Sequence, residues 1–148
     1  MRDFNLRFYS KRWPDEILEL KSNLDHYKKK PGCYVLGSSD GTNFIYPWGS
    51  SPIFYIGLSE TLRGRLKSHG KWIRRATEEH HKFHFAPLHQ YGASFGADAA
   101  IYKKRTNQSL SKLESSLITE FYNIYGSIPV ANRAWPKLMK KPLGVDLV

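Results

Sequence analysis

Apolar residues recur at two spacings along the chain, and these spacings separate predicted helices from predicted strands. Three segments carry apolar residues every three or four positions, the spacing of one helix face. They are residues 14–30, 61–78 and 109–125. Pro14 suits the first turn of the first helix and Pro31 ends it, whereas Gly70 is a point at which the second helix can kink or end early.

Short apolar runs beside glycines predict the strands. They are residues 32–36, 53–57 and 97–104, of which the last has the weakest pattern. Residues 37–52 are dense in Gly, Ser and Pro and predict a long hairpin connection, and residues 79–96 show no clean period and predict a loop. The order helix, strand, strand, helix, strand, helix predicts an α+β fold with a small three-stranded, mainly antiparallel sheet flanked by helices.

Length and composition indicate one globular domain. The chain has 148 residues, 41% of them hydrophobic, which is enough to bury a core. We expect a single domain over residues 1–148, with 1–30 as an N-terminal helical extension and 133–148 as a C-terminal tail. The single cysteine, Cys33, reads as a small buried hydrophobe and suits a reducing cytoplasm. No apolar run approaches the roughly 18 residues of a membrane span, and the N-terminus lacks the pattern of a secretory signal.

The charge predicts an anionic partner. Lys and Arg number 23 against 13 Asp and Glu, for a net charge of +10. Nucleic acid is the commonest partner of such a protein, and an acidic membrane surface is the alternative. The second predicted helix carries a basic stripe away from its apolar face, which we expect to follow a DNA backbone, and a second basic run follows the third strand. The candidates are Lys67, Lys71, Arg74 and Arg75 in the stripe and Lys103 and Lys104 in the run, where an ordinary solvated turn is an equally good reading.

Three ionisable residues fall on the apolar faces of predicted helices. On a helical wheel Arg65 and His69 lie within the apolar arc of the second helix, and Glu114 lies within that of the last. Removing one ion from water costs several kcal/mol unless a partner compensates, so two arrangements are open. Arg65 and Glu114 could form a buried ion pair, or they could line a polar cleft beside the sheet that holds a ligand.

The same residue types suit the cleavage of a phosphodiester. A guanidinium such as Arg65 matches phosphate oxygens, and the carboxylate of Glu114 is a ligand that Mg²⁺ or Mn²⁺ prefers. His69 titrates near neutral pH, and Tyr34 and Tyr55 add hydroxyls on two neighbouring strands. Two-metal chemistry requires several clustered carboxylates, so the sequence favours one metal ion.

Two strand motifs lead to a family resemblance. Gly32-Cys33-Tyr34 follows Pro31, and the next predicted strand contains Tyr55-Ile56-Gly57. In this arrangement the chain resembles the GIY-YIG nucleases, over roughly residues 31–132. Cys33 stands where the family has Ile, and Leu58 stands where the excision-repair branch has Lys, so the restriction and homing branches are the better match.

The resemblance extends to the helices and assigns roles. Arg65 stands eight residues after Gly57, and His69 follows four residues later. Glu114 lies in the predicted helix LESSLITEF. Asn132 ends the segment PVAN, and its interval from Glu114 is longer than in compact members of the family. It implies a Mg²⁺- or Mn²⁺-dependent DNA endonuclease with one ion per site. Tyr34 would be the general base toward water and Tyr55 its helper, Arg65 would bind phosphate, His69 would handle a proton or the phosphate, and Glu114 would hold the metal. Asn132 joins the DNA-contacting candidates, and a homodimer would cut both strands.

Two other functions remain open. One is a nucleic-acid-binding module that keeps the fold without cutting, in which an inward Glu114 has no purpose. The other is a metal-independent ribonuclease built on His69 and one of the histidines at positions 80, 81, 84 and 89. Those four histidines lack the spacing of a zinc site, and they predict a solvated or nucleic-acid-facing loop.

Overall fold

A computed structural model describes residues 13–79 and 84–133 of the chain. The elements in chain order are β1 (Glu16–Glu19), β2 (Gly32–Gly37), β3 (Phe44–Tyr46), β4 (Gly49–Ser51), β5 (Ile53–Ser59), α1 (Leu62–Glu78), α2 (Pro87–Phe95), β6 (Asp98–Lys103) and α3 (Leu110–Tyr125). The predicted α+β class, the three predicted strands and the last two predicted helices are confirmed. α1 continues through Gly70 without a break. The expectations for residues 1–12, for His80 and His81 and for most of the tail lie outside the described residues.

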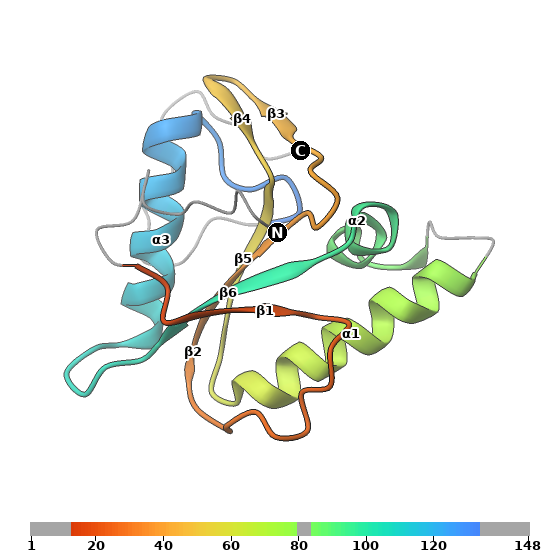
Figure 1. Ribbon diagram of the computed structural model, residues 1–148. Coiled ribbons are helices and arrows are strands. Elements are labelled where there is room, and N and C mark those ends of the chain that lie inside the picture. The colour runs from red at the N-terminus through yellow and green to blue at the C-terminus, as the bar shows by residue number, and fades with distance from the viewer. Residues whose placement is uncertain (1–12, 80–83, 134–148) are drawn as a thin grey trace.

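The main sheet has four strands, all antiparallel, in the order β1-β6-β2-β5 (Figure 1). β2 is central, and Tyr34 in its middle stands opposite Gly57 of β5 and Ile101 of β6. β5 forms one edge of this sheet. The prediction of three strands is therefore one strand short, and β3 and β4 form a separate small hairpin within the predicted connection.

The predicted helix over residues 14–30 is wrong. Its first part is β1, which pairs with β6 from Glu16 opposite Ile101 to Glu19 opposite Asp98. The open edge of β6 offers backbone hydrogen bonds to this segment, and such long-range pairing overrides local helical spacing. Leu20 and Leu24, which the helix would have buried, are still buried, but they lie in the turns that follow β1.

The predicted loop over residues 79–96 is wrong in its second half, which is α2. Pro87 starts this helix, and Gly96 ends it with φ of 76°. Gly92 lies so close to α1 that an added Cβ would stand 2.5 Å from the side chain of Ile73. The helix is short and contacts α1 through a glycine, so its sequence shows little apolar periodicity.

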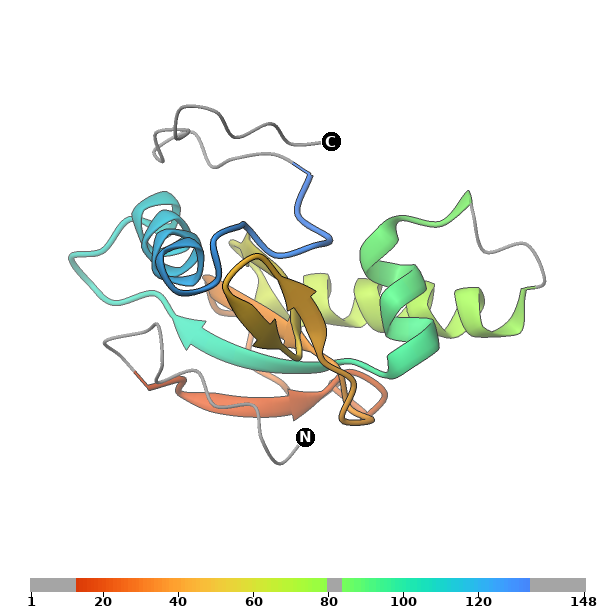
Figure 2. The same ribbon diagram turned by 90° about the horizontal axis from the view of Figure 1, so that it is seen from above.

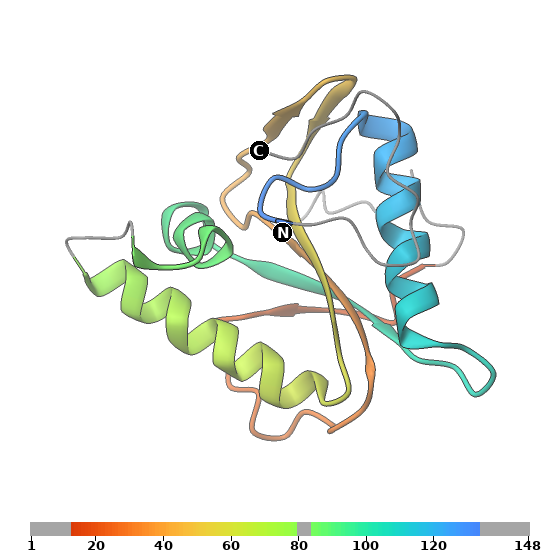
Figure 3. The same ribbon diagram turned by 180° about the vertical axis from the view of Figure 1, so that it is seen from behind.

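The sheet separates two cores. Figures 2 and 3 show α3 on one side of the sheet and α1 with α2 on the other. Because side chains alternate along a strand, Cys33 and Val35 face α3, while Tyr34 and Leu36 face α1. Cys33 is fully buried, as predicted. None of the described helices is both long and apolar enough for a membrane span.

Candidate active site

Tyr34 lies in the centre of the sheet and its phenol crosses Gly57 on the neighbouring strand. The side chain is fully buried, with 0% of its surface exposed. A Cβ at position 57 would stand 2.6 Å from the Tyr34 hydroxyl oxygen and 2.8 Å from the Tyr55 ring. Only glycine therefore leaves room for the phenol, which gives the Tyr-Gly pairing of the two strands a direct steric reason.

His69 meets the Tyr34 hydroxyl from helix α1. Its Nε2 lies 2.8 Å from the Tyr34 oxygen, and its Nδ1 lies 3.0 Å from Nε2 of His89 on α2. The imidazole is 7% exposed, so the prediction that His69 points inward is confirmed. Both ring nitrogens are thus occupied by titratable partners.

Tyr55 and Arg65 complete the α1 side of the site. The half-buried Tyr55 ring lies 6.0 Å from the Tyr34 ring and 6.2 Å from the His69 ring, centre to centre. Arg65 is exposed, so it lies on the open side of the site and is not buried with the apolar residues that share its arc on α1. From there the guanidinium charge acts on Tyr34, Tyr55 and His69.

Glu114 approaches from α3, on the opposite face of the sheet. Its half-buried carboxylate is close enough to raise the pKa of Tyr55, second to burial as a cause. Within the described residues Arg65 and Glu114 form no ion pair. The predicted buried ion pair is therefore absent, and the predicted polar cleft is the arrangement that stays open. Burial without a cation at hydrogen-bonding distance raises the pKa of Glu114.

Burial moves the pKa values of Tyr34, Tyr55 and His69 further from pH 7, so all three side chains are neutral there. It raises the pKa of Tyr34 well above the ordinary 10.0, and the Arg65 charge offsets only part of this. It also lowers the pKa of His69 from 6.5 to about 4, with His89 and Arg65 as further causes. A phenol that does not ionise can take a proton from water only if it passes its own proton on, and His69 stands at the correct atom to receive it.

Loss of fold stability on acidification is the first expected consequence. His69 stays neutral in the folded protein down to about pH 4, whereas it protonates near pH 6.5 when unfolded. The unfolded state therefore binds more protons in this window, and stability falls as the pH falls. We expect a loss on the order of 3 kcal/mol between pH 6.5 and 4. Urea unfolding of the wild type and of His69→Gln at several pH values measures it, and equal pH slopes for both proteins would contradict the assignment.

Asn132, a predicted DNA contact, binds the backbone of β5. Its Oδ1 accepts from the Ile56 N–H at 3.0 Å, and its Nδ2 donates to the Ile56 carbonyl at 2.8 Å. The neighbouring Ala131 N–H donates to the Phe54 carbonyl at 2.8 Å. Residues 131–132 thus occupy the outer edge of β5 on both sides of Tyr55. The side-chain amide of Asn132 therefore helps to hold β5 in place.

Removal of the Asn132 amide tests this structural role. Asn132→Ala leaves the N–H and carbonyl of Ile56 without their partners, and we expect a loss of about 1–3 kcal/mol in the free energy of unfolding. Chemical denaturation measures it, with the exposed Asn123→Ala on α3 as the matched control. A variant that unfolds like the wild type but binds DNA more weakly would restore the direct DNA role.

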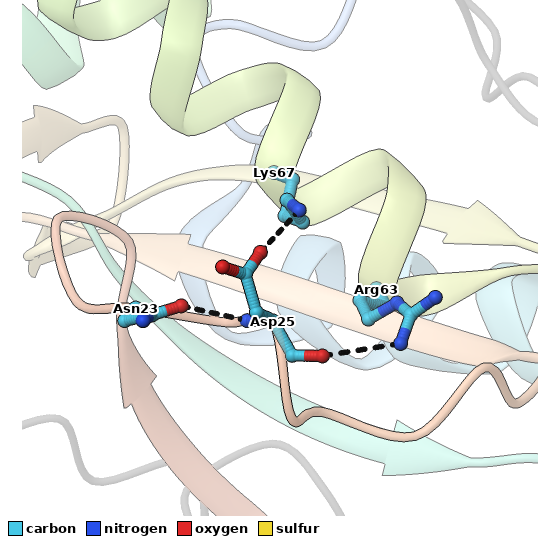
Figure 4. A network of polar contacts seen from close by, with 4 residues as sticks. All are labelled: Asn23, Asp25, Arg63 and Lys67. Carbon is cyan, nitrogen blue, oxygen red and sulfur yellow. Dashed lines mark hydrogen bonds and ion pairs between the residues drawn. The ribbon is translucent and has the colours of Figure 1, made fainter.

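The predicted basic stripe lies on the other side of α1. Lys67, Lys71 and Arg74 project about 140–200° around the helix from His69. They line a groove of about 660 Å³ between α1 and the turn at residues 20–25. Figure 4 shows Lys67 bound to the Asp25 carboxylate, while Arg63 donates to the Asp25 carbonyl. The stripe therefore faces away from the tyrosines.

The other basic candidates make different contacts. Arg75 adjoins the stripe on α1, and its guanidinium lies over the ring of Trp72, 5.0 Å from the ring centre. Lys103 pairs with Glu16 at 3.3 Å, and Lys104 is exposed after β6. The structure does not test the predicted DNA contacts of Arg75, Lys103 and Lys104.

The sequence offered His89 only as one of four histidines that could act with His69, in the ribonuclease alternative. It belongs to the histidine run that predicted a loop, yet α2 holds it against His69 and beside Trp72, with the two rings stacked at 6.4 Å. Nothing in the sequence spacing links positions 69 and 89, because their contact depends on the packing of α2 against α1.

The metal assignment depends on Glu114 alone. Among the described residues no group of three or more His, Cys, Asp or Glu side chains could hold a metal ion. A lone carboxylate still fits Mg²⁺, which keeps most of its waters and is completed by substrate phosphates. Glu114 has the required chemistry: it is half-buried, and no described cation neutralises it.

Comparison of the chain with known protein families, with curated proteins and with solved structures finds no match.

Proposed function

We propose that the protein is a divalent-metal-dependent endonuclease of the GIY-YIG type that hydrolyses DNA. One observation carries the proposal: the Tyr34 hydroxyl lies 2.8 Å from His69 and its ring lies 6.0 Å from that of Tyr55, while the charges of Arg65 and Glu114 act on these phenols. The site has an exposed cation and a half-buried carboxylate on opposite sides of two phenols. The exposed guanidinium of Arg65 can meet a phosphate from solvent, which a buried ion pair could not do.

Tyr34 and His69 would act together on the attacking water. In this step the Tyr34 hydroxyl would donate to His69 Nε2, which lies 2.8 Å away, and would accept the proton of water as its own proton leaves. Tyr55, next to Tyr34 and nearer to Glu114, would orient the water or a phosphate oxygen. Arg65 cannot lose its charge, so it would stabilise the negative charge that develops on the phosphate.

Glu114 would hold the metal ion. A bound Mg²⁺ or Mn²⁺ would supply Lewis-acid stabilisation of the departing oxygen. The carboxylate must be ionised to bind it, and burial opposes ionisation, so metal affinity should fall at mildly acidic pH.

The two alternatives fit the site less well. A pure binding module has no use for a half-buried Glu114 that no described cation neutralises. A metal-independent ribonuclease would place the phosphate between an acid and a base, but His69 and His89 are in direct contact at 3.0 Å, so no phosphate fits between them.

Plasmid cleavage tests the proposal. Supercoiled DNA should be nicked or linearised with Mg²⁺ and spared when a chelator is added. Cleavage of RNA that ignores the chelator would favour the ribonuclease, and binding without any cleavage would favour the binding module.

Neutralisation of the basic stripe shows whether DNA also contacts the groove. If Lys67 and Lys71 bind phosphates, the double change to Gln lowers affinity for all sequences and reduces the salt slope by about one unit per lost contact. Fluorescence titration at several salt concentrations measures this, with Lys28→Gln/Lys112→Gln as a control of equal charge. An unchanged slope would leave the Arg65 side of α1 as the DNA face.

A further inference from the structure

We infer that His89 is a positioning residue that completes a proton relay from Tyr34 through His69 to water. The inference rests on the proposed function and deepens it. Two contacts in series carry it: Tyr34 hydroxyl to His69 Nε2 at 2.8 Å, and His69 Nδ1 to His89 Nε2 at 3.0 Å. The two contacts use opposite nitrogens of the His69 ring, which is the geometry that lets an imidazole receive a proton on one side and release one on the other.

Exposure increases along the three groups. Tyr34 is 0% exposed, His69 is 7% exposed and His89 is half-buried. A proton that stopped on His69 would create an imidazolium in a place where burial strongly disfavours charge. Transfer to His89 moves the positive charge to the less buried of the two rings, although burial lowers the pKa of His89 too.

The relay balances without a further reactant. All three groups start neutral, and both histidines start with their proton on Nδ1. The Tyr34 O–H bond breaks and its proton passes to His69 Nε2, while the His69 Nδ1–H bond breaks and that proton passes to His89 Nε2. His69 ends neutral with its proton on Nε2, and His89 ends as an imidazolium. The electron pair left on the Tyr34 oxygen accepts the proton of the attacking water.

The fold holds His89 in place for this transfer. Its backbone N–H bonds to the Ala86 carbonyl in the first turn of α2, and the buried Leu88 and Gly92 anchor that helix. Trp72 stacks on the imidazole. Among the described residues, the charged and titratable groups around the relay are Tyr55 and Arg65 beside His69, and Arg75 over the Trp72 ring that stacks on His89.

Two substitutions separate proton transfer from simple orientation of His69. Gln places an oxygen near the position of His89 Nε2, so His89→Gln can still accept from His69 but cannot take its proton. His89→Ala loses both abilities. We expect both variants to slow single-turnover DNA cleavage roughly tenfold or more with unchanged DNA affinity and an altered acid limb of the pH–rate profile. Added imidazole should partly restore His89→Ala. Wild-type rates and pH profile for His89→Gln would overturn the relay.

Histidine NMR on the full-length chain gives a readout that does not depend on cleavage. With ¹⁵N-labelled histidine, we expect His69 and His89 to shift together in one coupled titration, and His69 to titrate differently in His89→Gln. Independent titration of the two rings would overturn the relay whether or not the protein cuts DNA. If His69 and His89 titrate together but the wild type cuts no DNA, the proposed function is contradicted, while the hydrogen bond between the two histidines is supported.

Discussion

Glu114→Gln is expected to abolish Mg²⁺-dependent cleavage while DNA binding remains. The change keeps the shape of the side chain and removes the charge that a divalent ion needs, so the loss should reach about 10³-fold or more. Arg65 and the other cations that attract DNA stay in place. Rates under single turnover and affinities measured with Ca²⁺ in place of Mg²⁺ separate the two effects.

The same variant has an expected effect on stability. Burial penalises the Glu114 carboxylate, so the neutral Gln should leave the free energy of unfolding unchanged or raise it. Glu79→Gln, an exposed change of equal charge at the end of α1, is the control and should cut at the wild-type rate. If Glu114→Gln cuts normally, the metal ligand lies elsewhere.

Tyr34→Phe is expected to slow cleavage by roughly 10²–10⁴-fold, the usual contribution of a general base. The change removes one oxygen and leaves the ring over Gly57, so the packing of the sheet is kept. It also removes the partner of His69 Nε2, and we expect a loss of about 1–2 kcal/mol in stability.

Tyr46→Phe is the matched control for Tyr34→Phe. The buried Tyr46 hydroxyl donates to the Ile53 carbonyl at 2.6 Å and accepts from the Val130 N–H at 3.1 Å, in the core beneath α3. It should lose a similar amount of stability and cut DNA at the wild-type rate. If both variants slow cleavage equally, the Tyr34 effect reflects lost stability and not chemistry.

Local pattern was sufficient for the elements that build the site. The apolar runs beside Gly32 and Gly57 predicted β2 and β5, and the helical spacing predicted α1 and α3. The inward direction of His69 followed from its place among apolar residues of α1, and the structure confirms it. These features depend on neighbouring residues, which a sequence displays directly.

The errors concern contacts between distant segments. β1 forms because β6 has an open edge, and α2 packs through Gly92, so neither leaves a clear local period. Arg65 is exposed because part of the apolar arc of α1 lies beyond the covered face of the sheet, whereas a helical wheel treats the whole arc as buried. The contact of His69 with His89 has the same origin and could not be read from spacing.

Cleavage of labelled random-sequence DNA in ¹⁸O-enriched water tests most directly whether this centre activates water against a phosphodiester. With Mg²⁺ and excess protein, a single turnover should place one ¹⁸O atom in the single new terminal phosphate of each cut, while the other new end is an unlabelled hydroxyl, as read by mass spectrometry of the mapped ends. Intact DNA, or products whose phosphate carries no ¹⁸O from the solvent, would contradict the hydrolytic role of Tyr34, His69, Arg65 and Glu114.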